Sequence, residues 1–155
     1  MTAAVLCAPH DIETNNYPNQ MEPVSHPQFC KGTILVMDDA AVMQQLLINM
    51  LGCLGYASVG TFEGTEALRL YKRTRDDGNP FTGVILDLHN RLGKGGIETI
   101  VDLQALDPEV NAVICSADTD SPAMNQFQTH GFRGTLVKPF GLDDLDNVLQ
   151  CMLGN

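Results

Sequence analysis

The sequence predicts an α/β fold: a doubly wound, five-stranded parallel sheet with helices on both faces. The first observation is that short apolar runs alternate with amphipathic stretches five times after residue 31. The second is that each run is continuously apolar, which is typical of parallel strands covered on both faces. The third is the length of 155 residues, which suits one such domain.

The first strand is predicted at Thr33–Met37, an apolar run that suits a buried strand. A helix is predicted over 41–54, because apolar residues recur there at helical spacing and Gly55 favours its end. Those apolar residues are Val42, Leu46, Leu47, Met50, Leu51 and Leu54. The next predicted elements are a strand at Ala57–Phe62, a helix at Gly64–Arg73 and a loop at Arg75–Pro80.

The three remaining units repeat this alternation. Their strands are predicted at Gly83–Asp87, Asn111–Ser116 and Gly134–Lys138. Their helices are predicted at Ile97–Leu106, Pro122–His130 and Leu142–Leu153. Right-handed crossovers leave few topologies for five such units, and the doubly wound sheet is the simplest.

Charge and composition divide the chain into two parts. Nineteen acidic and nine basic residues give a net charge of −10, which argues against nucleic acid and anionic membranes as main partners. Residues 1–30 hold four prolines and no Lys or Arg, so we predict a flexible tail or linker there and a folded domain over 31–155. The chain shows no apolar run near the ~20 residues of a membrane span. Its start also lacks a signal-peptide pattern, so we expect a cytoplasmic protein.

The five cysteines do not form a recognisable framework. Their number is odd and none forms a C-x-x-C pair, so we expect neither a disulfide framework nor a zinc site. Cys53 and Cys115 are expected to be small buried apolar residues.

Polar side chains gather where the predicted strands end. Asp38 and Asp39 follow the first strand, Asp87 ends the third, Ser116 the fourth and Lys138 the fifth. Because sites of doubly wound sheets lie at the carboxyl ends of the strands, we expect these five side chains to meet. A helix cap or a solvated surface would explain one of them, but a core needs no such set.

This set of groups suits one kind of chemistry. Three crowded carboxylates raise one another's pKa unless a cation compensates, and hard oxygen ligands favour Mg²⁺ or a similar ion. A carboxylate can be the nucleophile that forms an acyl phosphate, while a lysine and a hydroxyl contact the phosphoryl oxygens. The sequence therefore predicts an aspartate that accepts a phosphoryl group.

Three segments carry a family resemblance: 34–39 (ILVMDD), 84–87 (VILD) and 137–140 (VKPF). Together they resemble the receiver domain of two-component response regulators, over about residues 31–154. The resemblance implies the flavodoxin-like strand order 2-1-3-4-5. The amino-acid sequences of several segments are most similar to those of receivers at the C-terminus of bacterial hybrid sensor histidine kinases.

The resemblance also implies a metal site. The carboxylates of Asp39 and Asp87, with the backbone carbonyl of His89, would bind Mg²⁺ or Mn²⁺. Asp38 would order a water molecule bound to that metal.

The same resemblance assigns the phosphoryl chemistry. Asp87 would be the phosphoacceptor, Ser116 the hydroxyl that turns toward the phosphoryl group, and Lys138 its ion-pair partner. The family usually has a cis bond at the position of Lys138–Pro139.

Some positions depart from the family pattern. Thr135 stands where Tyr or Phe often reports the state of the hydroxyl, and Arg91 stands where Pro is frequent. His89 and Asp118 occupy positions that tune dephosphorylation in the family, although a solvated loop explains His89 equally well. Arg91 and Lys94 would either touch phosphate or relieve repulsion between the acids, and the sequence leaves both open.

We therefore expect a signalling module rather than an enzyme with a small-molecule substrate. A histidine kinase or a histidine phosphotransfer protein would phosphorylate Asp87. Phosphorylation would then shift the face built from the fourth helix, fifth strand and fifth helix, which would contact a downstream protein. The chain ends soon after the last helix, so we expect output through a protein contact; a homodimer stays open.

Three other functions fit the sequence less well. A receiver that docks without phosphorylation is weakened by the complete set of five polar residues, although Thr135 keeps it open. An aspartate-nucleophile phosphohydrolase requires D-x-D-x-T after the first strand, which 38–41 (DDAA) does not match. A flavodoxin-like mononucleotide binder needs a Ser/Thr/Gly-rich phosphate loop there, and acids would repel the phosphate.

Overall fold

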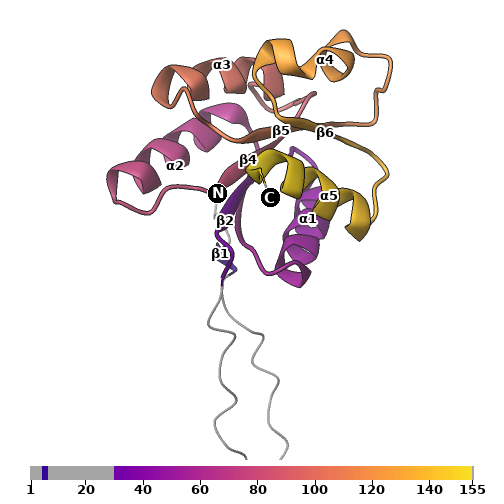
Figure 1. Ribbon diagram of the computed structural model, residues 1–155. Coiled ribbons are helices and arrows are strands. Elements are labelled where there is room, and N and C mark those ends of the chain that lie inside the picture. The colour runs from indigo at the N-terminus through magenta and orange to yellow at the C-terminus, as the bar shows by residue number, and fades with distance from the viewer. Residues whose placement is uncertain (1–4, 7–29, 155) are drawn as a thin grey trace, which may run out of the picture.

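The computed structural model describes residues 5–6 and 30–154, and Figure 1 shows how their elements are arranged. The six strands are β1 (Val5–Leu6), β2 (Thr33–Met37), β3 (Ala57–Thr61), β4 (Gly83–Asp87), β5 (Ala112–Ser116) and β6 (Gly134–Val137). The helices are α1 (Ala41–Cys53), α2 (Gly64–Asp76), α3 (Gly96–Leu106), α4 (Pro122–Asn125), the 3₁₀ helix η1 (Phe127–His130) and α5 (Leu142–Leu153).

Five of the strands form the predicted parallel sheet. They lie in the order β3-β2-β4-β5-β6, which is the order 2-1-3-4-5 when these five are counted along the chain. Met37 pairs with Leu86 and Asp87 pairs with Cys115, so the ends of β2, β4 and β5 lie at one edge. The predicted fold class is confirmed.

The sheet has one further strand that we did not expect. β1 pairs antiparallel with the outer strand β3, with Val5 opposite Val59 and Leu6 opposite Ser58. Two residues are too short to leave a sequence period, and this strand lies within the segment predicted as a tail or linker. The rest of that segment, residues 1–4 and 7–29, lies outside the described residues, so the tail stays a prediction.

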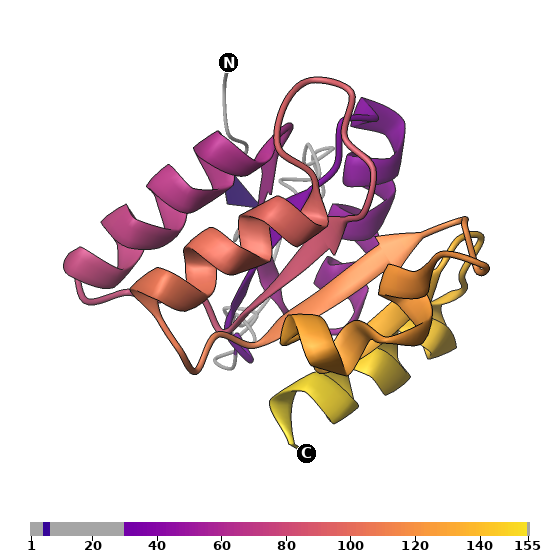
Figure 2. The same ribbon diagram turned by 90° about the horizontal axis from the view of Figure 1, so that it is seen from above.

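Two apolar cores lie on opposite faces of the sheet. α2, α3 and α4 cover one face, and α1 and α5 cover the other (Figure 2). Strand residues alternate between the cores: Leu35 and Met37 face the first, while Ile34 and Val36 face the second. The continuous apolar runs of the sequence are the result, because both faces of each central strand are buried.

Two helices differ from their predicted bounds by more than one residue. α2 continues to Asp76 rather than ending at Arg73, so the predicted loop at Arg75–Pro80 begins only after Asp76. Lys72 and Asp76 form an exposed i,i+4 ion pair in its last turns, which is compatible with this extension. The predicted helix 122–130 is α-helical for only four residues, and a 3₁₀ turn follows. Gly131 ends this turn in the left-handed conformation, φ 92°.

Four of the six apolar residues predicted for helix 41–54 face the core: Leu47 and Leu51 are buried, and the partly buried Met50 and Leu54 pack against them. Val42 and Leu46 do not, since they are 85% and 43% exposed, and Ile48 is buried in addition. Apolar spacing alone could not exclude Val42 and Leu46, because α1 has apolar residues around most of its surface. Cys115 is buried as expected. Cys53 is exposed, since it is the last residue of α1. No helix among residues 30–154 is long and apolar enough to cross a membrane.

Candidate functional site

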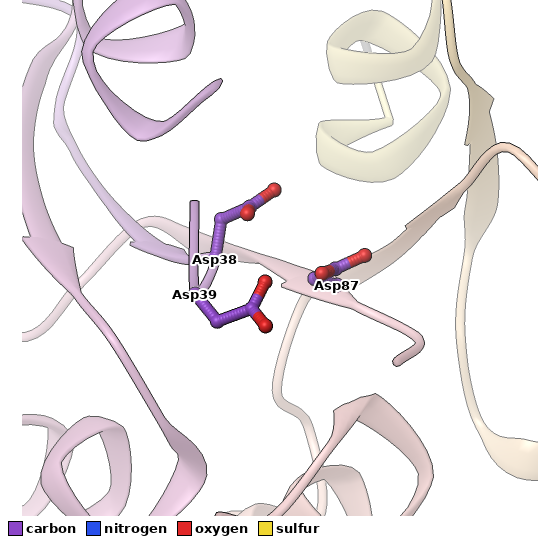
Figure 3. A group of neighbouring side chains, drawn as sticks. All are labelled: Asp38, Asp39 and Asp87. Carbon is purple, nitrogen blue, oxygen red and sulfur yellow. The ribbon is translucent and has the colours of Figure 1, made fainter. Parts of the chain in front are cut away.

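Three carboxylates meet at the carboxyl edge of the sheet (Figure 3). Asp38 and Asp39 directly follow β2, and Asp87 is the last residue of the adjacent strand β4. One oxygen from each lies within 4.8 Å of the others. Hard carboxylate oxygens at this spacing suit a divalent cation such as Mg²⁺, so this group could hold a metal ion.

Lys138 places its ammonium group beside two of these acids. Its Nζ lies 2.9 Å from Oδ2 of Asp38 and 3.3 Å from Oδ1 of Asp87. Lys138 directly follows β6, and the Lys138–Pro139 peptide bond is cis, as the resemblance implied. Burial opposes the charge of Lys138, but the hydrogen bond to Asp38 and the nearby anionic groups outweigh it and raise the pKa of Lys138.

Asp87 is the most perturbed of the acids. Its side chain is only 9% exposed, and burial together with the charge of Asp38 raises its pKa to about 6. Lys138 partly offsets this increase. An acid that loses its proton near neutral pH, in a partly desolvated site, is typical of a functional group.

Ser116 ends β5 next to Asp87's strand, and it is buried. Its Oγ accepts a hydrogen bond of 3.0 Å from the backbone N–H of Asp118. The preceding Cys115 is also buried, and burial raises the pKa of its thiol to about 12, so it stays protonated. The hydroxyl, and not the thiol, is therefore the polar group that β5 supplies at this edge.

The two basic residues left open by the sequence have different partners. Arg91 contacts Asp39: its Nε–H and its backbone N–H each donate to Oδ2 at 3.0 Å. Lys94 instead pairs with Asp102 at 2.5 Å. Burial would raise the pKa of Asp39, but the hydrogen bonds and charge of Arg91 lower it overall. Arg91 therefore relieves repulsion at the acidic cluster, and Lys94 does not.

His89 and Asp118 lie close to each other at the surface of the protein. Nε2 of His89 lies 3.9 Å from Oδ2 of Asp118, and their side chains are 71% and 51% exposed. This places the two positions that tune dephosphorylation in the resembling family beside each other and in contact with solvent.

Asn90 is a positioning residue that the sequence reasoning missed. Its Nδ2 donates to the carbonyl of Phe62 at 2.6 Å, and its Oδ1 accepts from the N–H groups of Leu92 and Gly93. The signal was present in the sequence, since Asn followed by a Gly-containing loop is typical of an Asx turn. Asn90 fixes the β4–α3 loop, which carries both His89 and Arg91.

A groove lies on the face formed by η1, β6 and α5. Its volume is about 510 Å³, and its lining includes Phe127, Thr135, Val137, Asn147 and Cys151. Thr135 is partly buried in β6 and contributes a small side chain to this lining. The space is therefore open where the resembling family often has an aromatic ring.

The fold and the acidic cluster together define a signalling domain of the response-regulator type. The family model of the response regulator receiver domain matches residues 34–150, so the chain belongs to this family. The matched range begins in β2 and ends in α5, and it includes every residue of the site.

Comparison with individual proteins agrees with this assignment. The chain is 29% identical to the chemotaxis protein CheY of Thermotoga maritima over 108 residues, which is 69% of this chain and 85% of the relative. The structure of CheY4 from Vibrio cholerae is similar with a TM-score of 0.68 and 27% identity, over 79% of this chain and 98% of that one.

A third relative has the same fold and carries a metal. It is the receiver domain of the sensor histidine kinase PA1611 from Pseudomonas aeruginosa, with a magnesium ion coordinated in its active site cleft. Its TM-score is 0.69 at 23% identity, over 80% of this chain and 98% of that one.

Proposed function

We propose that this receiver domain accepts a phosphoryl group on Asp87 from a phosphohistidine. The observation that carries the proposal is the convergence of Asp38, Asp39, Asp87 and Lys138 at one edge of the sheet. The donor would be a histidine kinase or a histidine phosphotransfer protein, either of a separate chain or of a longer hybrid kinase. The cytoplasmic location expected from the sequence is part of this proposal.

The chemical step follows from the positions of the side chains. An oxygen of the Asp87 carboxylate attacks phosphorus, the P–N bond of the phosphohistidine breaks, and the imidazole keeps the electron pair and takes up a proton. Lys138 lies against Asp87 and would pair with a phosphoryl oxygen. Ser116, on the adjacent strand, would hydrogen-bond another phosphoryl oxygen once its hydroxyl turns from the Asp118 amide.

The residues present fit a divalent cation. Asp39 and Asp87, with the backbone carbonyl of His89, would hold Mg²⁺ or Mn²⁺, and Asp38 would order a water molecule of the metal. When bound, the cation neutralises the negative charge that develops on the phosphoryl oxygens. Burial and the charges of Asp38 and Asp39 raise the pKa of Asp87, and a bound cation would favour its ionised form.

Exposed apolar side chains indicate where the donor would dock. Val42 lies in the first turn of α1, three residues after Asp39, and Leu92 lies in the β4–α3 loop. They are 85% and 61% exposed. Val42→Asp is expected to slow transfer from a phosphohistidine protein about tenfold, because the interface with the donor would then have to bury a charge. Phosphorylation by a small donor should be unchanged, and slowing of both reactions would contradict the docking role.

The output face would be the surface formed by α4, η1, β6 and α5. Phosphorylation would shift the population of two arrangements of this face, and a downstream protein would bind one of them more tightly. The groove beside Thr135 supports this proposal, because its open volume leaves room for side chains of the face to repack.

The experiment that tests the function uses the full chain, Mg²⁺ and acetyl phosphate, with the intact mass as readout. We expect one added phosphoryl group that hydroxylamine removes, since an acyl phosphate reacts with that nucleophile. Asp87→Asn and excess chelator should abolish the gain. Asp102→Asn, which changes an acid paired with Lys94, should leave it intact. A wild-type protein without any gain in mass would contradict the proposal, and rapid multiple-turnover release of phosphate would favour a phosphohydrolase.

A further inference from the structure

Each of the three acids of the site is paired with one of two basic residues, Arg91 or Lys138. Lys138 lies against Asp38 and Asp87, and Arg91 contacts Asp39. Oδ2 of Asp39 accepts two hydrogen bonds from Arg91, one from the side chain and one from the backbone. The guanidinium therefore holds a carboxylate that belongs to the three-acid group able to bind a metal ion.

Hydrogen bonds fix the backbone of the loop that carries Arg91. Asn90 ties the loop to the carbonyl of Phe62, and the N–H of Gly64 donates to the carbonyl of Lys94 at 3.1 Å. These bonds fix the backbone on both sides of Arg91. The side chain itself is 85% exposed, whereas the side chain of Asp39 is 8% exposed. The guanidinium can therefore move into water at little cost while the carboxylate stays in place.

We propose that Arg91 is a competing cation: its guanidinium closes the Asp39 side of the metal site, and a divalent cation must displace it in order to bind. This inference rests on the proposed function, because it concerns the metal of the same site. The guanidinium thereby weakens metal binding, since only the fraction of molecules in which it has left Asp39 can accept the ion.

Calorimetric titration of the full chain with Mg²⁺, at constant ionic strength, measures this effect. Arg91→Gln is expected to bind Mg²⁺ about two- to fivefold more tightly, a size typical of an exposed ion pair. Arg69→Gln is the matched control: it removes a guanidinium that donates to Glu66, outside the site. It should bind with the wild-type affinity. Equal affinities of wild type and Arg91→Gln would overturn the proposal.

A second measurement separates displacement from a general effect of charge. The ¹⁵Nε–H resonance of Arg91 should move to the position of a free arginine as Mg²⁺ is added, with the same midpoint as metal binding. The resonance of Arg69 should stay in place. Tighter binding by Arg91→Gln with an unmoved Arg91 resonance would show an effect of charge at a distance and would overturn displacement. A wild-type protein that binds no Mg²⁺ would overturn the proposed function as well.

Discussion

Asp87 owes its properties to burial and to the charges of its neighbours rather than to its own chemistry. Burial and the charge of Asp38 disfavour its ionised form, and the ammonium of Lys138 favours it. The result is a carboxylate that stays ionised at neutral pH at a cost to the folded state. That cost is the reason for expecting a bound cation to stabilise the domain.

The pH dependence of stability follows from the raised pKa of Asp87. The pKa of Asp87 is raised to about 6 in the folded protein, against an ordinary value of 3.8. The folded protein therefore binds this proton more tightly than the unfolded chain does. Metal-free stability should therefore fall as pH rises through this window. Asp87→Asn removes the charge, so we expect about 1–2 kcal/mol of added stability near pH 7.5, vanishing below about pH 4.

Urea unfolding in the presence of a chelator measures that difference. Asp76→Asn is the control, because Asp76 lies on the exposed surface of α2 in a pair with Lys72. It should change stability by no more than about 0.5 kcal/mol. An Asp87→Asn protein that is no more stable than wild type near neutral pH would contradict this account of the site.

The convergence of the five polar residues could be predicted from the sequence, because strand ends of a doubly wound sheet share one edge. The partners of Arg91 and Lys94 could not. Both residues lie in the β4–α3 loop, and their choice between Asp39 and Asp102 depends on a turn set by Asn90. Side-chain pairing in such a loop depends on tertiary contacts rather than on a sequence period.

Among the elements, the β4–α3 loop is held by close packing against the start of α2. A Cβ on Gly64 would collide with the buried Thr99 hydroxyl and lie 2.7 Å from Cβ of Lys94. Thr99 cannot turn away easily, because its Oγ1 donates to the carbonyl of Gly95 at 2.7 Å. The absence of a side chain at Gly64 therefore lets the start of α2 pack against α3 and the loop that precedes it.

Gly64→Ala should destabilise the protein by about 1–3 kcal/mol, because it overpacks this contact. Gly52→Ala is the matched control, since a Cβ there meets nothing within 4 Å inside α1. That variant should gain about 0.5–1 kcal/mol from helix propensity alone. Chemical denaturation of both variants checks the pair, and equal effects would contradict the packing argument.

Helix α4 should be the least protected helix among residues 30–154. It has four α-helical residues and buries only Met124, and η1 buries none. Short helices with few buried contacts open at low free-energy cost. Hydrogen exchange should therefore be faster over 122–130 than over α1 or α5. Addition of Mg²⁺ and beryllium fluoride, a phosphoryl mimic, should change the exchange of this segment most. Slow exchange that these additions leave unchanged would contradict its proposed place in the output face.

Most element boundaries could be predicted, and the exceptions have physical causes. The strands were predicted to within a residue, because continuous apolar runs end where polar site residues begin. The break in helix 122–130 was missed, since Gln126 and its neighbours carry no strong helix breaker. β1 was missed because two residues that extend a sheet edge leave no pattern. Val42 and Leu46 do not share the buried face of α1 with the other apolar residues predicted there, because apolar residues occur almost all round this helix.

For the molecule as a whole, the net charge of −10 has several sources. Three of the nineteen acids lie in residues 1–30, and three others form the site. The sheet separates two cores and gathers the site at one edge, next to the loops and helices that would meet a donor and an output partner. A change of charge at Asp87 is thus placed where it can influence several surfaces at once.

The central claim is that Asp87 is the phosphoacceptor, and mapping of the modified residue tests it most directly. The protein, loaded with Mg²⁺ and phosphorylated from a phosphohistidine donor, is treated with borohydride, which reduces an aspartyl phosphate to homoserine. Peptide mass spectrometry should find homoserine at position 87. Phosphorylation of another residue, or no homoserine in a protein that has received the phosphoryl group, would contradict the account.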